Sequence, residues 1–165
     1  MSRIQADDLL LPSVLDRLID LEPDNSREVP LERTQSLREL KASVRRDLEN
    51  LLNTRVPFPL LPAGSQHLPS SLLNYGVPDF SSVVLEARST LDELRVEIET
   101  TIRTFEPRFQ SVRVEFDAAR MGRSNRFIRF IIDGVLHAEP APEPVRFSSQ
   151  LHSISNEYRL QEVGV

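Results

Sequence analysis

The residues of this sequence that could do acid–base chemistry are carboxylates. Glu106 and Glu115 lie close together in the chain, near a change from helical to strand-like patterning. A glycosidase needs two carboxyl groups that face each other across a cleft, one of them kept protonated. Glu115 alternates with apolar residues, however, which indicates the solvent-facing side of a strand. Solvated strand charges are therefore the favoured interpretation, and a peptidoglycan-cleaving glycosidase that uses Glu106 and Glu115 is kept as the alternative.

Other site chemistries have weaker support. His67, His137 and His152 show none of the spacings of metal ligands, so no metal site is predicted. The chain has no cysteine, which excludes disulfides, thiol nucleophiles and cysteine zinc sites. Its glycines are isolated and form no phosphate-binding loop, and no serine lies in a nucleophile elbow. No catalytic residue and no cofactor are expected.

Charge and hydropathy argue against further classes of partner. The chain has 25 acidic and 20 basic residues and a formal net charge of −5, which disfavours nucleic-acid binding by bulk charge. A basic turn at Arg120, Arg123 and Arg126 lacks the interleaved aromatic residues of a single-strand binding surface. No apolar stretch has the length of a membrane span or of a signal peptide. We predict a cytoplasmic protein with no membrane insertion and no nucleic-acid partner.

The triplet Glu106-Pro107-Arg108 marks a corner in the chain. Proline disfavours helical geometry in the residue before it, so a helix is expected to end at Glu106. The alternation of residues 111–118 then predicts a half-buried strand. Two interpretations are equally supported by the residues alone. Either the triplet is a helix stop with a local ion pair, or Arg108 is held rigidly at the corner for a protein partner.

Apolar periodicity predicts the helices that lead to this corner. A short helical pattern covers residues 13–21, and a capping box at Ser36 and Glu39 opens a helix of about five turns. A second long helix starts with a weaker capping pair, Ser89 and Asp92, and ends at the corner. Between the two lie a proline-rich loop and a one-turn helix, capped by Ser70 or Ser71, that Gly76 stops.

Beyond the corner, the pattern changes to a period of two, typical of strands. Further strands are predicted over residues 126–138 and 144–152, and a short one follows from Tyr158. Gly134 either bends a strand or closes an Asp-Gly hairpin, and a bulge or kink within one long strand is favoured.

The order of these elements and the length of 165 residues predict a single α+β domain covering residues 1–165. Its N-terminal helices pack on a small, mainly antiparallel C-terminal sheet. We expect residues 1–12 and the loop 22–35 to be flexible.

Several stretches of the chain, taken in order, resemble one family. They are SVLDRLIDLEP, SLRELKASVRRDLENLLNTR, SSLLNYGVPD, IETTIRTFEPRF with its Glu-Pro-Arg core, RFIIDGVL, and EPVRFSSQL with a final strand that contains Tyr158. Together they span almost the whole chain. The sequence resembles the TssE family of type VI secretion baseplate subunits, which is related to the baseplate wedge proteins of contractile-tailed phages historically labelled "lysozyme-like".

The resemblance implies a structural, non-enzymatic role. Members of this family build the baseplate wedge with the TssF, TssG and TssK subunits, and seed sheath polymerisation by sharing β-strands with the first sheath ring. It also implies that Glu106, Pro107 and Arg108 are the family's signature triplet, a partner-binding site linked to wedge assembly. Arg108→Ala should then weaken assembly and leave the fold largely intact. A small cytosolic adaptor of the same fold is a further alternative.

Overall fold

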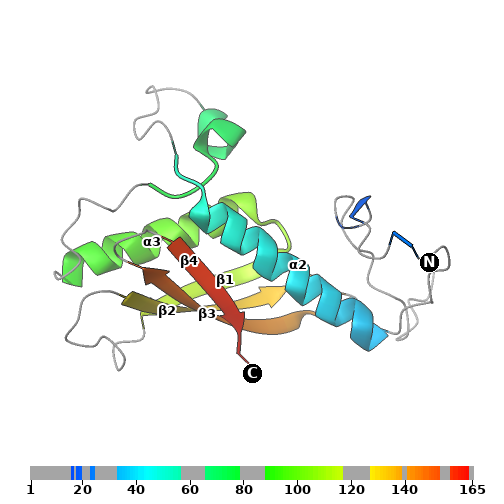
Figure 1. Ribbon diagram of the computed structural model, residues 1–165. Coiled ribbons are helices and arrows are strands. Elements are labelled where there is room, and N and C mark those ends of the chain that lie inside the picture. Colours follow the sequence, from blue (N-terminus) through cyan, green and yellow to red (C-terminus); the bar gives the residue numbers. More distant parts are fainter. Residues whose placement is uncertain are drawn as a thin grey trace.

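A computed structural model of the chain describes residues 33–56, 66–78, 88–116, 127–138, 141–152 and 157–163, with isolated positions between residues 16 and 24. Within these residues, two long helices with two short 3-10 turns between them precede four strands (Figure 1). The elements are α2 (Arg33–Asn53), η1 (Leu68–Ser70), η2 (Leu72–Asn74), α3 (Arg88–Phe105), β1 (Phe109–Phe116), β2 (Phe127–Leu136), β3 (Glu143–His152) and β4 (Glu157–Glu162). The predicted α+β class, with helices first and strands afterwards, is confirmed.

Several expectations fall outside the described residues. Segment 1–12, for which flexibility was predicted, lies wholly outside them, and so do most of the predicted helix 13–21 and of the predicted loop 22–35. The turn with its three arginines, residues 117–126, also lies outside. The single-domain prediction for residues 1–165 therefore stays a prediction.

The four strands form one antiparallel sheet in the order β1-β2-β3-β4. Both helices cover the same face of this sheet, with α3 against β1 and α2 against β4 (Figure 1). The core lies between these two layers, where the predicted apolar stripes of both helices meet alternate residues of each strand. Its fully buried members include Val44, Leu48, Leu52, Leu94, Ile98, Ile102, Val114, Phe130, Ile132, Leu136 and Phe147.

The predicted helix caps are wrong in detail. Helix α2 begins at Arg33 and α3 at Arg88, so Ser36 and Ser89 lie inside their helices rather than before them. Ser36 is only 5% exposed. A capping box shows which residue could begin a helix, but the helix can still extend further towards the N-terminus. The predicted one-turn helix is instead two 3-10 turns on either side of Ser71.

Gly134 continues β2 rather than ending it, so the prediction of one long strand is confirmed. Its pairing with Val112 of β1 and Val145 of β3 is in regular register. The irregularity lies in β1 instead, between Phe109 and Ser111. The ring of Phe109 lies over Gly134, where an added Cβ would come within 2.3 Å of a ring carbon. Any larger residue at this position would have to displace the ring, which explains the glycine.

Side chains of α2 cap the outer edge of β4. The amide of Asn53 donates to the Tyr158 carbonyl oxygen at 2.9 Å and accepts from the Tyr158 N–H at 2.8 Å. Glu49, one turn earlier on α2, accepts from the N–H of Leu160 at 2.8 Å. Three outward backbone groups of this strand are therefore already hydrogen-bonded within the chain.

The outer edge of β1 is capped in the same way by α3. Arg103 donates to the carbonyl oxygen of Val112 at 3.1 Å, and Glu99 accepts from the N–H of Val114 at 3.3 Å. Unpaired edges invite strand addition from other chains, and covering them is a common protection. Helix side chains thus cover part of the outer edge of β1 and part of that of β4.

Burial of Tyr158 predicts a loss of stability in alkaline solution. Its side chain is 2% exposed, and burial raises the pKa of its phenol to about 12, against the opposing charge of Arg55. The unfolded chain loses this proton near pH 10, so the folded state loses stability as the pH rises from 10 to 12. Because one pKa unit corresponds to about 1.4 kcal/mol, we expect a loss of roughly that size at pH 11.

Urea unfolding of the wild type and Tyr158→Phe at pH 9 and pH 11 measures this effect. The phenylalanine variant should lose less stability between the two pH values than the wild type. The chain has a single lysine and a second tyrosine, Tyr75, so few other groups titrate in this range. Equal losses in both proteins would contradict the assignment to Tyr158.

Candidate partner-binding site at the Glu-Pro-Arg corner

The corner joins the end of α3 directly to the start of β1. The N–H of Glu106 donates to the carbonyl oxygen of Ile102 at 2.9 Å, which closes the last helical turn. The N–H of Phe109, the first residue of β1, donates to the carbonyl oxygen of Glu106 at 3.3 Å. The predicted helix end at Glu106 is therefore confirmed, with Pro107 exposed at the tip of the turn.

A local ion pair holds the triplet together. The Arg108 guanidinium donates from Nε to Oε1 of Glu106 at 2.7 Å and from Nη2 to Oε2 at 2.5 Å. The backbone N–H of Arg108 also donates to Oε1, at 3.2 Å. This two-pronged geometry is the strongest arrangement of an arginine with a carboxylate. The Glu106 side chain is 6% exposed, so the pair lies largely out of water.

Arg108 also reaches helix α2. Its Nη2 donates to Oδ2 of Asp47 at 2.6 Å, and its Nη1 donates to the hydroxyl oxygen of Ser43 at 2.9 Å. One guanidinium thus links the end of α3, the start of β1 and the middle of α2. The contacted residues of α2 are more than 60 residues from Arg108 in sequence. The local ion pair that the sequence suggested is accordingly one part of a larger network.

The network closes into a ring of side chains. The Ser43 hydroxyl donates to Asp16 at 2.7 Å, and Arg46 donates to the other oxygen of Asp16 at 2.7 Å. Arg46 also donates to Oδ1 of Asp47, from Nε at 3.0 Å and from Nη2 at 2.9 Å. We call this set the polar cluster: Asp16, Ser43, Arg46, Asp47, Glu106 and Arg108.

Electrostatics favour the charged form of both arginines in the cluster. Burial by itself would lower the pKa of Arg108, but hydrogen bonds and charges of Glu106 and Asp47 outweigh it and raise the pKa above its ordinary value. The hydrogen bond to Asp16 chiefly raises the pKa of Arg46. Both side chains remain cations wherever the protein is folded, so the cluster acts as a fixed set of charges.

This arrangement can brace the corner and hold the Arg108 side chain in a fixed orientation. All three nitrogens of the Arg108 guanidinium donate within the chain, and the side chain is 23% exposed. Pro107 and the exposed part of Arg108 form the outward surface of the corner. These internal contacts do not test whether a partner binds at the corner. The partner-binding role of Glu106, Pro107 and Arg108 therefore stays a prediction.

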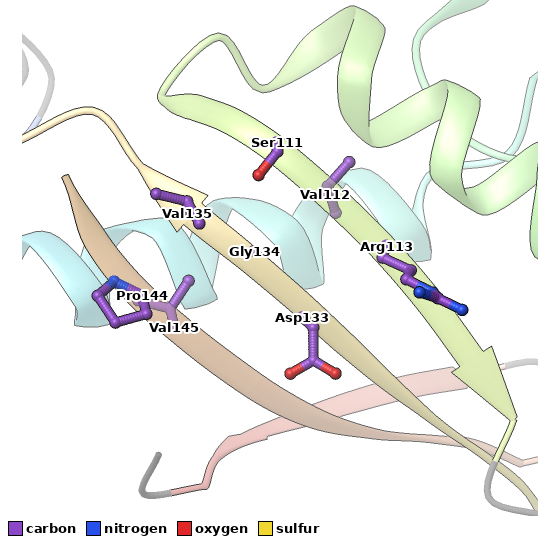
Figure 2. Close-up of a pocket in the computed structure, with 8 residues that line it drawn as sticks. All are labelled: Ser111, Val112, Arg113, Asp133, Gly134, Val135, Pro144 and Val145. Atoms are coloured by element: carbon purple, nitrogen blue, oxygen red, sulfur yellow. The ribbon is translucent and has the colours of Figure 1, made fainter.

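Glu106 and Glu115 have different surroundings. Both carboxylate oxygens of Glu106 accept hydrogen bonds from Arg108, whereas Glu115 is 53% exposed and pairs with Arg113 at 2.8 Å. A hollow of about 300 Å³ lies on the sheet face away from α2 (Figure 2). Neither glutamate lines it, and its one lining carboxylate, Asp133, is bridged to Arg146 at 2.5 Å.

The described parts of the chain contain neither a cluster of metal-ligating side chains nor a membrane-spanning helix. There, no group of three or more histidine, aspartate or glutamate side chains has an arrangement that could hold a metal ion. None of the described helices is long and apolar enough to cross a bilayer.

Sequence reasoning missed Ser43, Asp47 and Asp16 as members of the site. Asp47 and its neighbours appeared only as the charged face of a helix, with nothing to connect them to Arg108. Contacts across such sequence separations carry no local signal in a single sequence. The fork of Arg108 towards Glu106, two residues away, was the part that local reasoning could find.

Comparison with known proteins identifies the family. A family model described as baseplate wedge protein gp25 matches residues 38–141. The match covers more than half of the chain and includes α3, β1, β2 and the whole triplet. Neither the curated proteins nor the solved structures gave a match to the chain. The chain therefore belongs to the gp25 family of baseplate wedge proteins, the family to which TssE subunits belong.

Proposed function

We propose that the chain is the baseplate subunit of a type VI secretion machine, where it joins the wedge subunits TssF, TssG and TssK to the contractile sheath in the cytoplasm. The observation that carries the proposal is the match of residues 38–141 to the baseplate wedge protein gp25. This family is generally structural, and a baseplate component has protein partners within the baseplate. The type VI setting comes from the resemblance to TssE.

In this proposal, the corner serves wedge assembly as a braced contact surface. Pro107 projects from the turn, and the buried Glu106 and the polar cluster fix the Arg108 side chain behind it. Proline and a pre-organised arginine lose little conformational entropy when a partner binds. The partner would contact Pro107 and the exposed part of Arg108, while the internal hydrogen bonds of Arg108 persist.

Sheath seeding by strand sharing would use the edge of β1. Two hydrogen bonds from α3 cap this edge, and Glu99 also pairs with Arg103 at 2.5 Å and Arg95 at 3.5 Å. If an arriving strand displaced Arg103 and Glu99 from β1, these two side chains would still pair with each other. On β4, by contrast, Asn53 would lose both of its hydrogen bonds to Tyr158. The difference in what is lost favours β1 as the receiving edge.

Co-purification tests the wedge part of this proposal. The tagged chain is expressed with TssF, TssG and TssK, and the eluate is analysed by size-exclusion chromatography and mass spectrometry. We expect one complex that contains the chain. A wedge that assembles completely without it would contradict the proposal.

Hydrogen exchange tests the strand-sharing part separately. The amide of Val114 should become more protected when sheath subunits bind, because a strand backbone replaces the long contact to Glu99. The amides of Tyr158 and Leu160 serve as the internal control and should change little. Binding of sheath subunits without added protection at either edge would show that the sheath docks in another way.

A further inference from the structure

The segment between α2 and α3 presents two leucines to solvent. On η2, Leu72 is 86% exposed and Leu73 is 55% exposed, and Leu72 is the most exposed large apolar side chain among the described residues. We call this pair the leucine knob. In Figure 1 the short coil that carries it stands away from the sheet, beyond the C-terminal end of α2. Such exposure of adjacent leucines costs solvation free energy and calls for an explanation.

The sequence around the knob contains no formally charged residue. Residues 56–78 contain no aspartate, glutamate, lysine or arginine, although 27% of the chain is charged. Depletion of charge together with exposed apolar side chains is the composition of the buried centre of a protein interface. The same composition offers no cation to attract anionic lipid headgroups or nucleic-acid phosphates.

The knob is held in place rather than carried on a loose loop. The N–H of Val77 donates to the carbonyl oxygen of Thr54 at 2.9 Å, and the N–H of Val56 donates to the carbonyl oxygen of Val77 at 3.2 Å. Val77 itself is fully buried. Within the coil, the Ser71 hydroxyl donates to the carbonyl oxygen of Leu68 at 2.8 Å. Because the coil is already ordered, little entropy is lost when the leucines bind.

The base of the knob adjoins the corner. Tyr75, which follows η2, packs its ring edge-to-face on Phe105, the last residue of α3, with 5.3 Å between ring centroids. Burial, and then the charges of Asp47 and Glu106, raise the pKa of its phenol. Through Tyr75, the base of the knob therefore contacts the last residue of α3, next to the corner.

We infer that the leucine knob inserts into an uncharged apolar pocket of another protein of the baseplate and forms a second anchor beside the corner. This inference rests on the proposed function. The hollow on the outer face of the sheet is a poor site for the knob of a second copy, because Arg113 and Asp133 line it (Figure 2). Paired leucines in a fitted apolar pocket would bury apolar surface beside the corner.

Binding of the purified chain to a reconstituted TssF–TssG–TssK wedge tests the knob. The double variant Leu72→Ser/Leu73→Ser should bind about tenfold more weakly or worse, the usual range for loss of an apolar anchor. Val96→Ser is the matched control, since Val96 is an apolar residue of α3 that is 51% exposed and lies outside the knob. The control should bind as the wild type does. Leu72→Gln alone carries the test if the double variant misfolds.

The outcomes separate the two proposals. Equal binding by the wild type and the double variant would overturn the inference about the knob and leave the wedge role intact. Absence of wild-type binding overturns the wedge role and the knob together. Sedimentation of the chain alone gives a third outcome: a wild-type dimer that the double variant abolishes would place the knob in a second copy and overturn the inference.

Discussion

Arg108→Ala should lower the free energy of unfolding by about 2–4 kcal/mol, the loss expected when a mostly buried ion pair loses one partner. The variant leaves Glu106, 6% exposed, without both of its side-chain hydrogen bonds from the guanidinium. It also removes the donor to Ser43 and Asp47, so α2 loses its polar link to the corner. Urea unfolding followed by circular dichroism measures the loss.

Two further variants separate the loss of these specific contacts from the loss of a positive charge. Arg46→Ala removes a cation from the same cluster, but Arg46 is 37% exposed, and its loss should cost about 1 kcal/mol or less. Arg108→Lys keeps the charge without the two-pronged fork and should fall between Arg108→Ala and the wild type. Wild-type stability of Arg108→Ala would mean that the cluster is not a structural link. These contacts revise the earlier expectation of an intact fold, so assembly assays of the variant belong at a temperature where it is folded.

Gly76→Ala should cost about 2–4 kcal/mol, because backbone strain at a forbidden φ adds to a steric clash. Gly76 has a φ of 119°, a conformation that L-residues rarely adopt. An added Cβ would lie 2.4 Å from the carbonyl oxygen of Thr54, and backbone atoms cannot easily retreat. That oxygen is the one that accepts from the N–H of Val77, so the clash falls on the link that holds the leucine knob.

The same variant should also weaken binding to the wedge, since the knob would shift relative to the corner. Thermal unfolding and the wedge-binding assay measure the two effects in parallel. Ser70→Ala is the control within the same coil, because its exposed hydroxyl makes only one long hydrogen bond, to His67 at 3.3 Å. Its stability should stay within about 0.5 kcal/mol of the wild type. A Gly76→Ala protein as stable as the wild type would contradict the close approach to Thr54.

The sequence predicted the elements because their signals are local. The stripes of α2 and α3 and the alternation of the strands follow from burial on one face, and Pro107 ends α3 through its own geometry. The irregularity between Phe109 and Ser111 carried no such signal, because it places Gln110 and Ser111 both at the surface of an otherwise alternating strand. An extra exposed polar residue looks the same in a sequence whether or not it is part of a bulge.

The contacts of the candidate site also divide into local ones, which the sequence could predict, and long-range ones, which it could not. The pair of Glu106 and Arg108 was accessible to reasoning about neighbours, but the contacts of Arg108 with Ser43 and Asp47 depend on how α2 lies against the corner. The caps on the sheet edges were missed for the same reason. Asn53 and Glu49 reach β4 over more than 100 residues of sequence, and nothing in their local pattern distinguishes them from an ordinary solvated helix face.

The capped edges change the kind of reaction that strand addition would be. At a free edge, an arriving strand forms new hydrogen bonds with backbone groups that only water had satisfied. At β1, bonds that a strand would form with the Val112 carbonyl oxygen and the Val114 N–H replace bonds already made with Arg103 and Glu99, so fewer hydrogen bonds are gained than at a free edge. Apolar side chains that the strand buries must then supply more of the net driving force. Recognition at this edge would therefore depend more on the sequence of the arriving strand than it would at a free edge.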